Sequence, residues 1–277
     1  MRSVRDLLEA SIDYAGLFPP AALPMISAVR NYAEYRRGPH GWALGRFVVA
    51  AERFAEFEDA YRQLDECRRG GAPWKFSGLG RAPAAVDTVE LKAESPGEIR
   101  KSMELLPPGV TAYFEIPTAQ HPGGFLTQLA QCGARAKVRT GGVTPEMVPA
   151  SSDIARFLSA CAHAKVRFKA TAGLHHAVRS LHPLTYEAHG PCAVMHGFLN
   201  VFLAAALVDC GGSQAEALGT LEETAGAAFR FDDDGVSWHG YRLTTGQLRS
   251  AREDFAVSFG SCSFEEPMSD LEELGLL

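Results

Sequence analysis

Eight short apolar segments recur along the chain and alternate with stretches of helical character. They cover residues 11–15, 47–51, 75–79, 88–93, 112–116, 136–140, 167–171 and 255–259. Such alternation is typical of parallel strands joined by crossover helices. Eight parallel strands close a barrel, and the 277 residues suffice because a barrel of this kind takes about 250. We therefore predict an α/β fold, a (β/α)8 TIM barrel, built by residues 1–277 as a single domain.

One connection in this pattern is too long for a simple barrel. Residues 172–254 separate the seventh and eighth predicted strands, where roughly 30–40 residues normally suffice. We expect an insertion at approximately 180–250, with an apolar helix near 195–208, a second helix near 213–225 and a hairpin turning at 232–235. We interpret it as a lid or an oligomer contact.

Composition and charge narrow the classes of partner. The net charge of −6 argues against a nucleic-acid partner, which normally requires a basic surface. The longest apolar run, 201–208, is too short to span a bilayer, so no membrane partner is expected. The amino-terminal residues do not form a secretory signal, and none of the six cysteines belongs to a C-x-x-C pair. We expect a soluble cytoplasmic protein with reduced thiols, and a homo-oligomer remains open.

Charged residues occupy alternate positions in several predicted strands. Successive strand residues point to opposite faces, and the outer face of a parallel barrel packs against helices. Lys137, Arg139 and Lys169 should therefore point into the barrel, and Glu90 and Glu115 repeat the pattern in the fourth and fifth strands. A buried charge without a partner costs several kcal/mol. These side chains must form an internal salt-bridge network or take part in chemistry.

Two lysines on neighbouring strands suggest one such chemistry. Nearby ammonium groups in a partly dry site lower each other's pKa. A lysine that is neutral near pH 7 can attack a carbonyl carbon and form a Schiff base. This is a physical reason for placing Lys137 beside Lys169.

Five motifs, in order along the chain, resemble the deoxyribose-phosphate aldolase family and, more broadly, the Schiff-base (class I) aldolases. They are Ile12-Asp-Tyr-Ala-Gly-Leu-Phe-Pro-Pro20, Val86-Asp-Thr-Val89, Lys137-Val-Arg-Thr-Gly141, Lys169-Ala-Thr-Ala-Gly173 and Phe259-Gly-Ser-Cys-Ser263. Each motif alone is weak, but the order is specific. The resemblance covers the chain apart from the insertion.

The resemblance implies a lyase of carbohydrate metabolism that cleaves or forms carbon–carbon bonds on a small carbonyl substrate. It implies Lys137 as the Schiff-base nucleophile, Lys169 with Arg139 as the groups that lower its pKa, and Asp87 with Glu115 as proton carriers. The residues expected to bind the substrate are Asp13, Thr171, Gly173, His175, Gly260, Ser261 and Ser263. No cofactor or metal is implied, and the sequence has no nucleotide-binding glycine motif.

The chain also departs from the family pattern. Arg139 stands where the family has a small polar residue, and His175 and His176 stand where it continues with an arginine. Glu265 and Glu266 follow the serines that resemble a phosphate site, and their charge disfavours a phosphate. We therefore do not expect deoxyribose phosphate to be the substrate.

Two alternatives remain open at the level of sequence. The first is a metal-dependent TIM-barrel hydrolase or lyase that uses His175, His176 and His196 together with glutamates. The second is a non-catalytic barrel that only binds a ligand.

Overall fold

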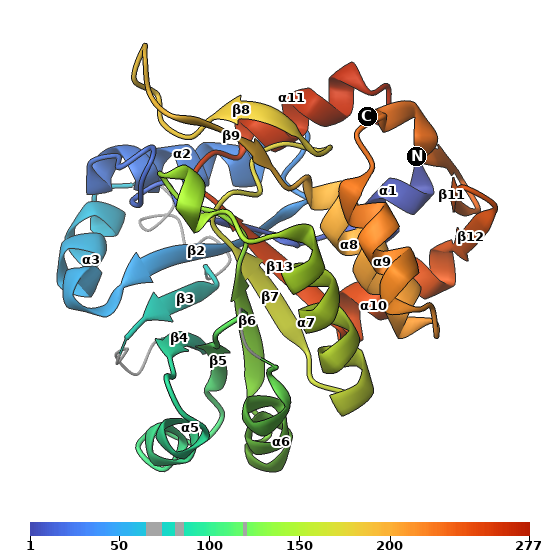
Figure 1. Ribbon diagram of the computed structural model, residues 1–277. Helices are drawn as coiled ribbons and strands as arrows, with labels where there is room; N and C mark the ends of the chain where they lie inside the picture. The colour runs from blue at the N-terminus through green and yellow to red at the C-terminus, as the bar shows by residue number, and fades with distance from the viewer. Residues whose placement is uncertain (65–73, 81–85, 119–120) are drawn as a thin grey trace.

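The computed structural model describes residues 1–64, 74–80, 86–118 and 121–277. Eight parallel strands close into a barrel in the order β1-β13-β7-β6-β5-β4-β3-β2, so the TIM-barrel prediction is confirmed (Figure 1). All eight predicted segments supply its strands. These are β1 (Ile12–Tyr14), β2 (Leu44–Ala50), β3 (Phe76–Leu79), β4 (Thr88–Lys92), β5 (Thr111–Glu115), β6 (Arg135–Arg139), β7 (Phe168–Thr171) and β13 (Ala256–Ser261).

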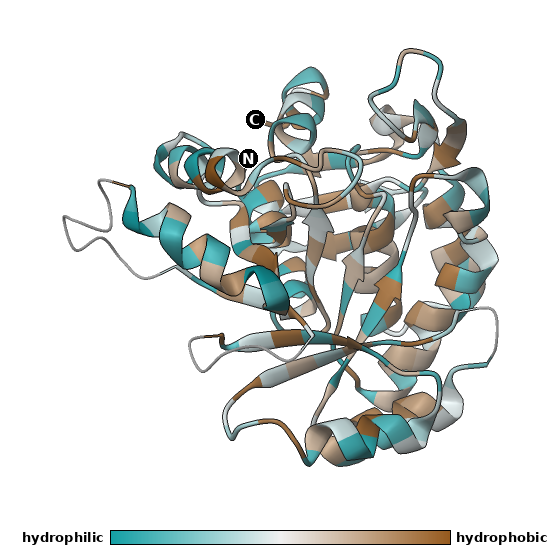
Figure 2. Cartoon of the chain, turned by 90° about the vertical axis from the view of Figure 1, so that its left-hand side faces the viewer, coloured by the Kyte–Doolittle hydropathy of each residue, from teal (hydrophilic) through white to brown (hydrophobic). Residues whose placement is uncertain are grey.

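Helices surround the barrel; all but α1, before the first strand, and α11, after the last, lie between strands along the chain. Figure 2 shows hydrophilic and hydrophobic bands along them, as expected for helices that pack one side against strands. Their bounds are α1 (Arg2–Leu8), α2 (Met25–Arg37), α3 (Phe54–Arg62), α5 (Pro96–Met103), α6 (Gly123–Cys132), α7 (Ser151–Ala164), α8 (Phe198–Asp209), α9 (Gln214–Glu222), α10 (Thr245–Asp254) and α11 (Glu265–Glu273).

The two faces of the strands differ as the alternation predicts. Ala136 and Val138 of β6 are fully buried in the apolar layer beneath the helices, and Phe168 of β7 packs edge-on against Phe157 of α7. Lys137 and Lys169 occupy the intervening positions and lie directly opposite each other in the parallel pairing of β6 with β7. The barrel lumen therefore receives the charged side chains.

The long connection after β7 divides into two parts with different positions. A two-stranded antiparallel hairpin, β8 (Ser180–Pro183) and β9 (Cys192–Met195), comes first and was not predicted. The expected apolar helix is α8, whose Phe198 stacks on Phe259 of β13 at 5.2 Å between ring centroids. Helix α10 also packs against β13. Of the two expected roles of the insertion, a lid or an oligomer contact, the first is wrong for α8 and α10, because both cover the barrel wall.

The rest of the insertion forms a small peripheral sheet. The predicted hairpin is present as β10 (Arg230–Asp232) and β11 (Gly235–Trp238), and β12 (Tyr241–Thr244) extends it to three antiparallel strands. Among the described residues, no helix has the length and apolar character needed to cross a membrane. The five described cysteines are free thiols, and Cys67 lies outside the described residues.

Candidate functional site

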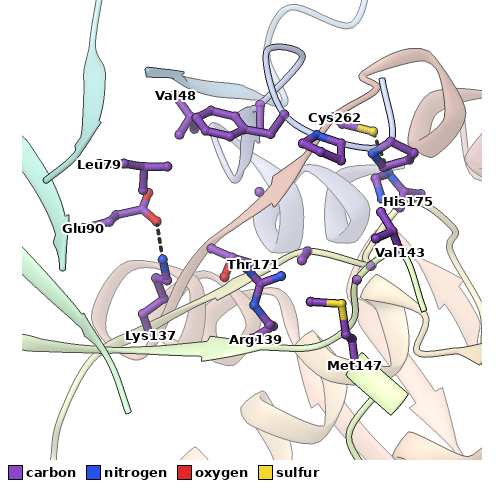
Figure 3. A pocket seen from close by; sticks show the side chains of 18 of the residues that line it. Val48, Leu79, Glu90, Lys137, Arg139, Val143, Met147, Thr171, His175 and Cys262 are labelled. Carbon is purple, nitrogen blue, oxygen red and sulfur yellow. Dashed lines mark hydrogen bonds and ion pairs between the residues drawn. The ribbon is translucent and has the colours of Figure 1, made fainter. Parts of the chain in front are cut away.

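A cavity of about 290 Å³ opens at the carboxyl ends of the barrel strands. This is the end at which TIM-barrel enzymes place their active sites. Its floor holds charged side chains from three strands, and apolar residues such as Phe18, Leu79 and Met147 line its walls. Figure 3 shows Glu90 and Lys137 at one end of the cavity, His175 and Cys262 at the other, and Arg139 between them.

Lys169 is the most deeply buried charge of the site. Its side chain is 1% exposed, and its Nζ lies 2.6 Å from Asp13 Oδ2 and 2.7 Å from Glu90 Oε1. The two carboxylates also accept hydrogen bonds from serine hydroxyls, because Ser77 donates to Glu90 at 2.7 Å and Ser258 donates to Asp13 at 2.9 Å. Buried ion pairs are stable only with such additional hydrogen bonds.

Lys137 is more exposed than Lys169. Its Nζ is 3.1 Å from Glu90 Oε2 and 3.0 Å from Glu115 Oε2, and its side chain is 9% exposed. The two lysines therefore bind the two oxygens of one carboxylate, that of Glu90. Because the strand register places Glu115 directly opposite Lys137, the β5–β6 pairing fixes the second contact.

The charges of this cluster set the protonation of its members. Burial works to raise the pKa of Glu90, but the ammonium groups of Lys169 and Lys137 outweigh burial and lower this pKa to about 2. Burial works to lower the pKa of Lys169, but Asp13 and Glu90 outweigh it and raise this pKa above its usual value. Lys169 is therefore a permanent cation, and Glu90 a permanent carboxylate, near neutral pH.

This result corrects the expectation for Lys169, whose pKa was expected to be lowered by its neighbour. The pKa of Lys169 is raised instead, because Asp13 and Glu90 both contact its ammonium group. Lys169 is consequently a fixed charge and no proton carrier.

Arg139 and Thr171 form the upper wall of the cavity. Arg139 is 41% exposed at its side chain and reaches Glu115 Oε1 only at 3.9 Å, and one of its Nη atoms donates to the Gly141 carbonyl at 3.3 Å. Its guanidinium group thus keeps donors directed at the cavity. Thr171 and Gly260, paired across β7 and β13, complete this wall.

Two glycines bring the loops after β6 and β7 into direct backbone contact. Gly173 has φ +79°, and a Cβ built on it would lie 2.9 Å from the Gly141 Cα. Thr140 stabilises this contact between the two loops, since its hydroxyl donates to the Ala172 carbonyl. Gly173 lines the cavity through its backbone.

His175 and Cys262 line the cavity at its mouth, and Ser261 contacts His175 from behind the lining. His175 Nδ1 lies 3.0 Å from Ser261 Oγ and 3.7 Å from Cys262 Sγ. Burial, aided by the neighbouring histidines His176 and His182, lowers the pKa of His175 to about 4, so its ring is neutral at pH 7. Burial raises the pKa of Cys262 to about 11, which keeps it a thiol and argues against a nucleophilic role.

Five of the expected site residues do not line the cavity. Asp13, Glu115 and Ser261 contact residues that do, whereas Asp87 and Ser263 are engaged elsewhere. Asp87 precedes β4, at the opposite end of the barrel, and forms an exposed ion pair with Arg46 at 3.1 Å. It shares the strand parity of the outward-facing Val89, which explains why it does not reach the lysines. Ser263 accepts a hydrogen bond from the backbone N–H of Glu266 in the first turn of α11.

The histidines proposed as metal ligands do not converge. His196 is fully buried and its Nε2 donates to the Pro149 carbonyl at 2.8 Å, while His176 Nδ1 lies 3.3 Å from Asp270 Oδ2. Across the described part of the chain, no group of three or more His, Cys, Asp or Glu side chains is arranged to hold a metal. The geometry therefore gives the metal-dependent alternative no support.

Glu90 is the central residue of the cluster, and the sequence directed it into the barrel but gave it no role in the site. The available signal was its alternation with the apolar Val89 and Leu91, which directs it to the lumen. Ser77 and Ser258 carried no comparable signal, since a serine in a strand is unremarkable.

Comparisons of the chain with models of known protein families, with curated proteins and with solved structures give no match.

Proposed function

We propose that this protein is an aldolase-like lyase that binds a small carbonyl substrate as a Schiff base on Lys137. The observation that supports this most directly is the division of labour between the lysines. Both lysines line the cavity, but Lys137 is the more exposed, at 9% against 1%, and it contacts two carboxylates, while Lys169 is held in a buried ion-pair network with Asp13 and Glu90.

The carboxylates around Lys137 supply the proton transfers that such a reaction needs. Glu115 takes a proton from the Lys137 ammonium group over 3.0 Å, and the resulting amine attacks the carbonyl carbon of the substrate. The carbinolamine then loses water, whose departing oxygen takes the proton held by Glu115, to give an iminium ion. When the Cα–Cβ bond breaks, the iminium accepts its electron pair and becomes an enamine, while the β-hydroxyl gives its proton to the Glu115 carboxylate and becomes the carbonyl of the released aldehyde.

Fixed charges hold this machinery in place. Lys169 keeps Glu90 ionised and oriented, so Glu90 and Glu115 together hold Lys137. Arg139 presents donors to a polar group of the substrate. The apolar wall of Phe18, Leu79 and Met147 excludes water, which strengthens every charge interaction inside.

Borohydride trapping tests the proposal. Wild-type protein incubated with glycolaldehyde and reduced should gain one adduct by mass spectrometry, and peptide mapping should place it on Lys137. Lys137→Met should lose the adduct. The matched control is Lys101→Met, an exposed lysine on α5, which should trap as wild type does.

Equal trapping by Lys137→Met and wild type would refute the assignment. Tight ligand binding with no adduct on any lysine would instead favour the non-catalytic barrel. A stoichiometric metal whose removal abolishes activity would favour the metal-dependent alternative.

A further inference from the structure

A second cavity of about 440 Å³ adjoins the first at the barrel mouth. Pro20, Gly142 and His175 line both, so the two spaces meet at His175. The β8–β9 hairpin and the segment joining its strands form one side, through His182 and Tyr186, and the start of α11 forms the other. A substrate whose carbonyl carbon reaches Lys137 therefore extends its far end into this second space.

The charged groups around the second cavity are acidic. Glu187 and Glu266 line it, and among its described lining residues there is no lysine or arginine. Asp270 stands behind His176, with its Oδ2 3.3 Å from Nδ1. His175 adds no positive charge at neutral pH, because burial keeps its ring neutral. An anionic substrate group would meet two carboxylates and no permanent cation.

The serine hydroxyls that would bind a phosphate at this site already form hydrogen bonds within the protein. The Ser261 hydroxyl bonds to His175, and the Ser263 hydroxyl accepts from the Glu266 N–H at 3.2 Å. Glu265 and Glu266 occupy the first turn of α11, so negative charge already offsets the positive end of that helix.

The lining is well suited to hydroxyl groups. Carboxylates accept hydrogen bonds from hydroxyls, and neutral imidazoles and tyrosine both donate and accept. The Tyr186 hydroxyl donates to Glu266 Oε1 at 3.0 Å, and Glu266 Oε2 lies 3.5 Å from His175 Nδ1. These two contacts fix the Glu266 carboxylate where the two cavities meet. His175 Nε2 has no hydrogen bond to any described residue, so it is free to bond to the substrate.

We infer that the second cavity binds the far end of the substrate, and that this end is a neutral, hydroxylated chain without a phosphate. This inference rests on the proposed function, because Lys137 defines where the carbonyl end lies. It assigns Glu266 as the residue that excludes phosphorylated aldehydes.

The test compares three aldehydes by borohydride trapping on Lys137: glycolaldehyde, D-erythrose and D-erythrose 4-phosphate. Glycolaldehyde is too short to reach the second cavity. Phosphorylation of O4 prevents ring closure, so a larger fraction of the phosphate ester is free aldehyde. This difference by itself favours trapping of the phosphate ester, which is the opposite of the result we expect. We expect D-erythrose to be trapped about tenfold or more efficiently than its phosphate, as like-charge repulsion predicts.

Glu266→Lys should reverse or remove this preference by improving trapping of the phosphate ester. Glu265→Lys is the matched control, since it makes the same charge change one residue away on a side chain that does not line the cavity. The control should keep the wild-type preference.

The outcomes separate the two levels of the proposal. Failure of glycolaldehyde to trap on Lys137 would overturn the proposed function itself. Trapping of glycolaldehyde together with equal or better trapping of D-erythrose 4-phosphate by wild type would overturn only the inference about the second cavity. If Glu266→Lys does not fold, the wild-type comparison still decides the question.

Discussion

Replacing Lys169 by methionine tests whether the buried charge network governs stability. Methionine keeps most of the aliphatic length but removes the ammonium group that contacts Asp13 at 2.6 Å and Glu90 at 2.7 Å. Both carboxylates stay buried, and Glu90 keeps Lys137 and Ser77 as its only partners among the described residues. The change therefore breaks two buried ion pairs at once.

The expected loss follows from the burial of the network. Removing one partner of a buried pair costs about 3–5 kcal/mol. Since a domain is stable by only about 5–15 kcal/mol, Lys169→Met should lower the free energy of unfolding by a large fraction at pH 7. Lys101→Met should change it by less than about 0.5 kcal/mol, as expected for an exposed residue.

The pH dependence gives a second signature. In the wild type the pKa of Glu90 is about 2, so the stability it contributes is complete above its ordinary value near 4.5 and is lost as the pH falls towards 2. Without Lys169, burial dominates and the pKa of Glu90 rises. The folded variant then takes up a proton as the pH falls, so its deficit should shrink by about 1.4 kcal/mol per pH unit below that pKa.

Urea unfolding followed by circular dichroism at pH 7 and pH 5 measures both effects. A deficit below about 1 kcal/mol at pH 7, or one that grows towards pH 5, would refute the reasoning. The double variant Lys169→Met with Asp13→Asn should be less destabilised than the sum of the single variants, because the two side chains are in contact.

Two further predictions concern the mouth of the site. The pKa of His175 is lowered to about 4, so its contribution to stability is complete above about pH 6.5 and is lost as the pH falls towards 4. Urea titrations should therefore show that this residue contributes about 2 kcal/mol less at pH 5 than at pH 7. The variant His175→Asn should lose less stability between pH 7 and pH 5 than the wild type does. Gly173→Ala should lower stability by about 1–3 kcal/mol in the same assay, because the residue has φ +79° and its Cβ would collide with Gly141. The control Gly97→Ala, whose Cβ meets no atom within 4 Å, should not lower stability. Equal stability of Gly173→Ala and wild type would contradict the close approach of the two loops.

Much of the site was predictable because strand alternation is a local rule. The side chains of Lys137, Arg139 and Lys169 were expected in the lumen from their spacing alone, and the structure puts them there. Asp87 shows the limit of motif similarity, since the parity of β4 directs Glu90 inward and leaves Asp87 paired with Arg46 at the other end.

The insertion shows a second limit. Its apolar helix was visible in the sequence, but periodicity does not reveal what a helix packs against. Contact with Phe259 makes α8 part of the barrel wall, while the unpredicted β8–β9 hairpin borders the second cavity. These positions depend on contacts between residues far apart along the chain.

The sequence by itself determined the barrel and the inward direction of its charges, because both follow from periodicity within short segments. Only the tertiary structure decided that one carboxylate, Glu90, contacts both lysines, and that Lys169 is thereby a fixed cation whose own pKa is raised and not lowered. The physical reason is that ion pairing depends on how β4, β6 and β7 face one another across the lumen, which no single strand encodes.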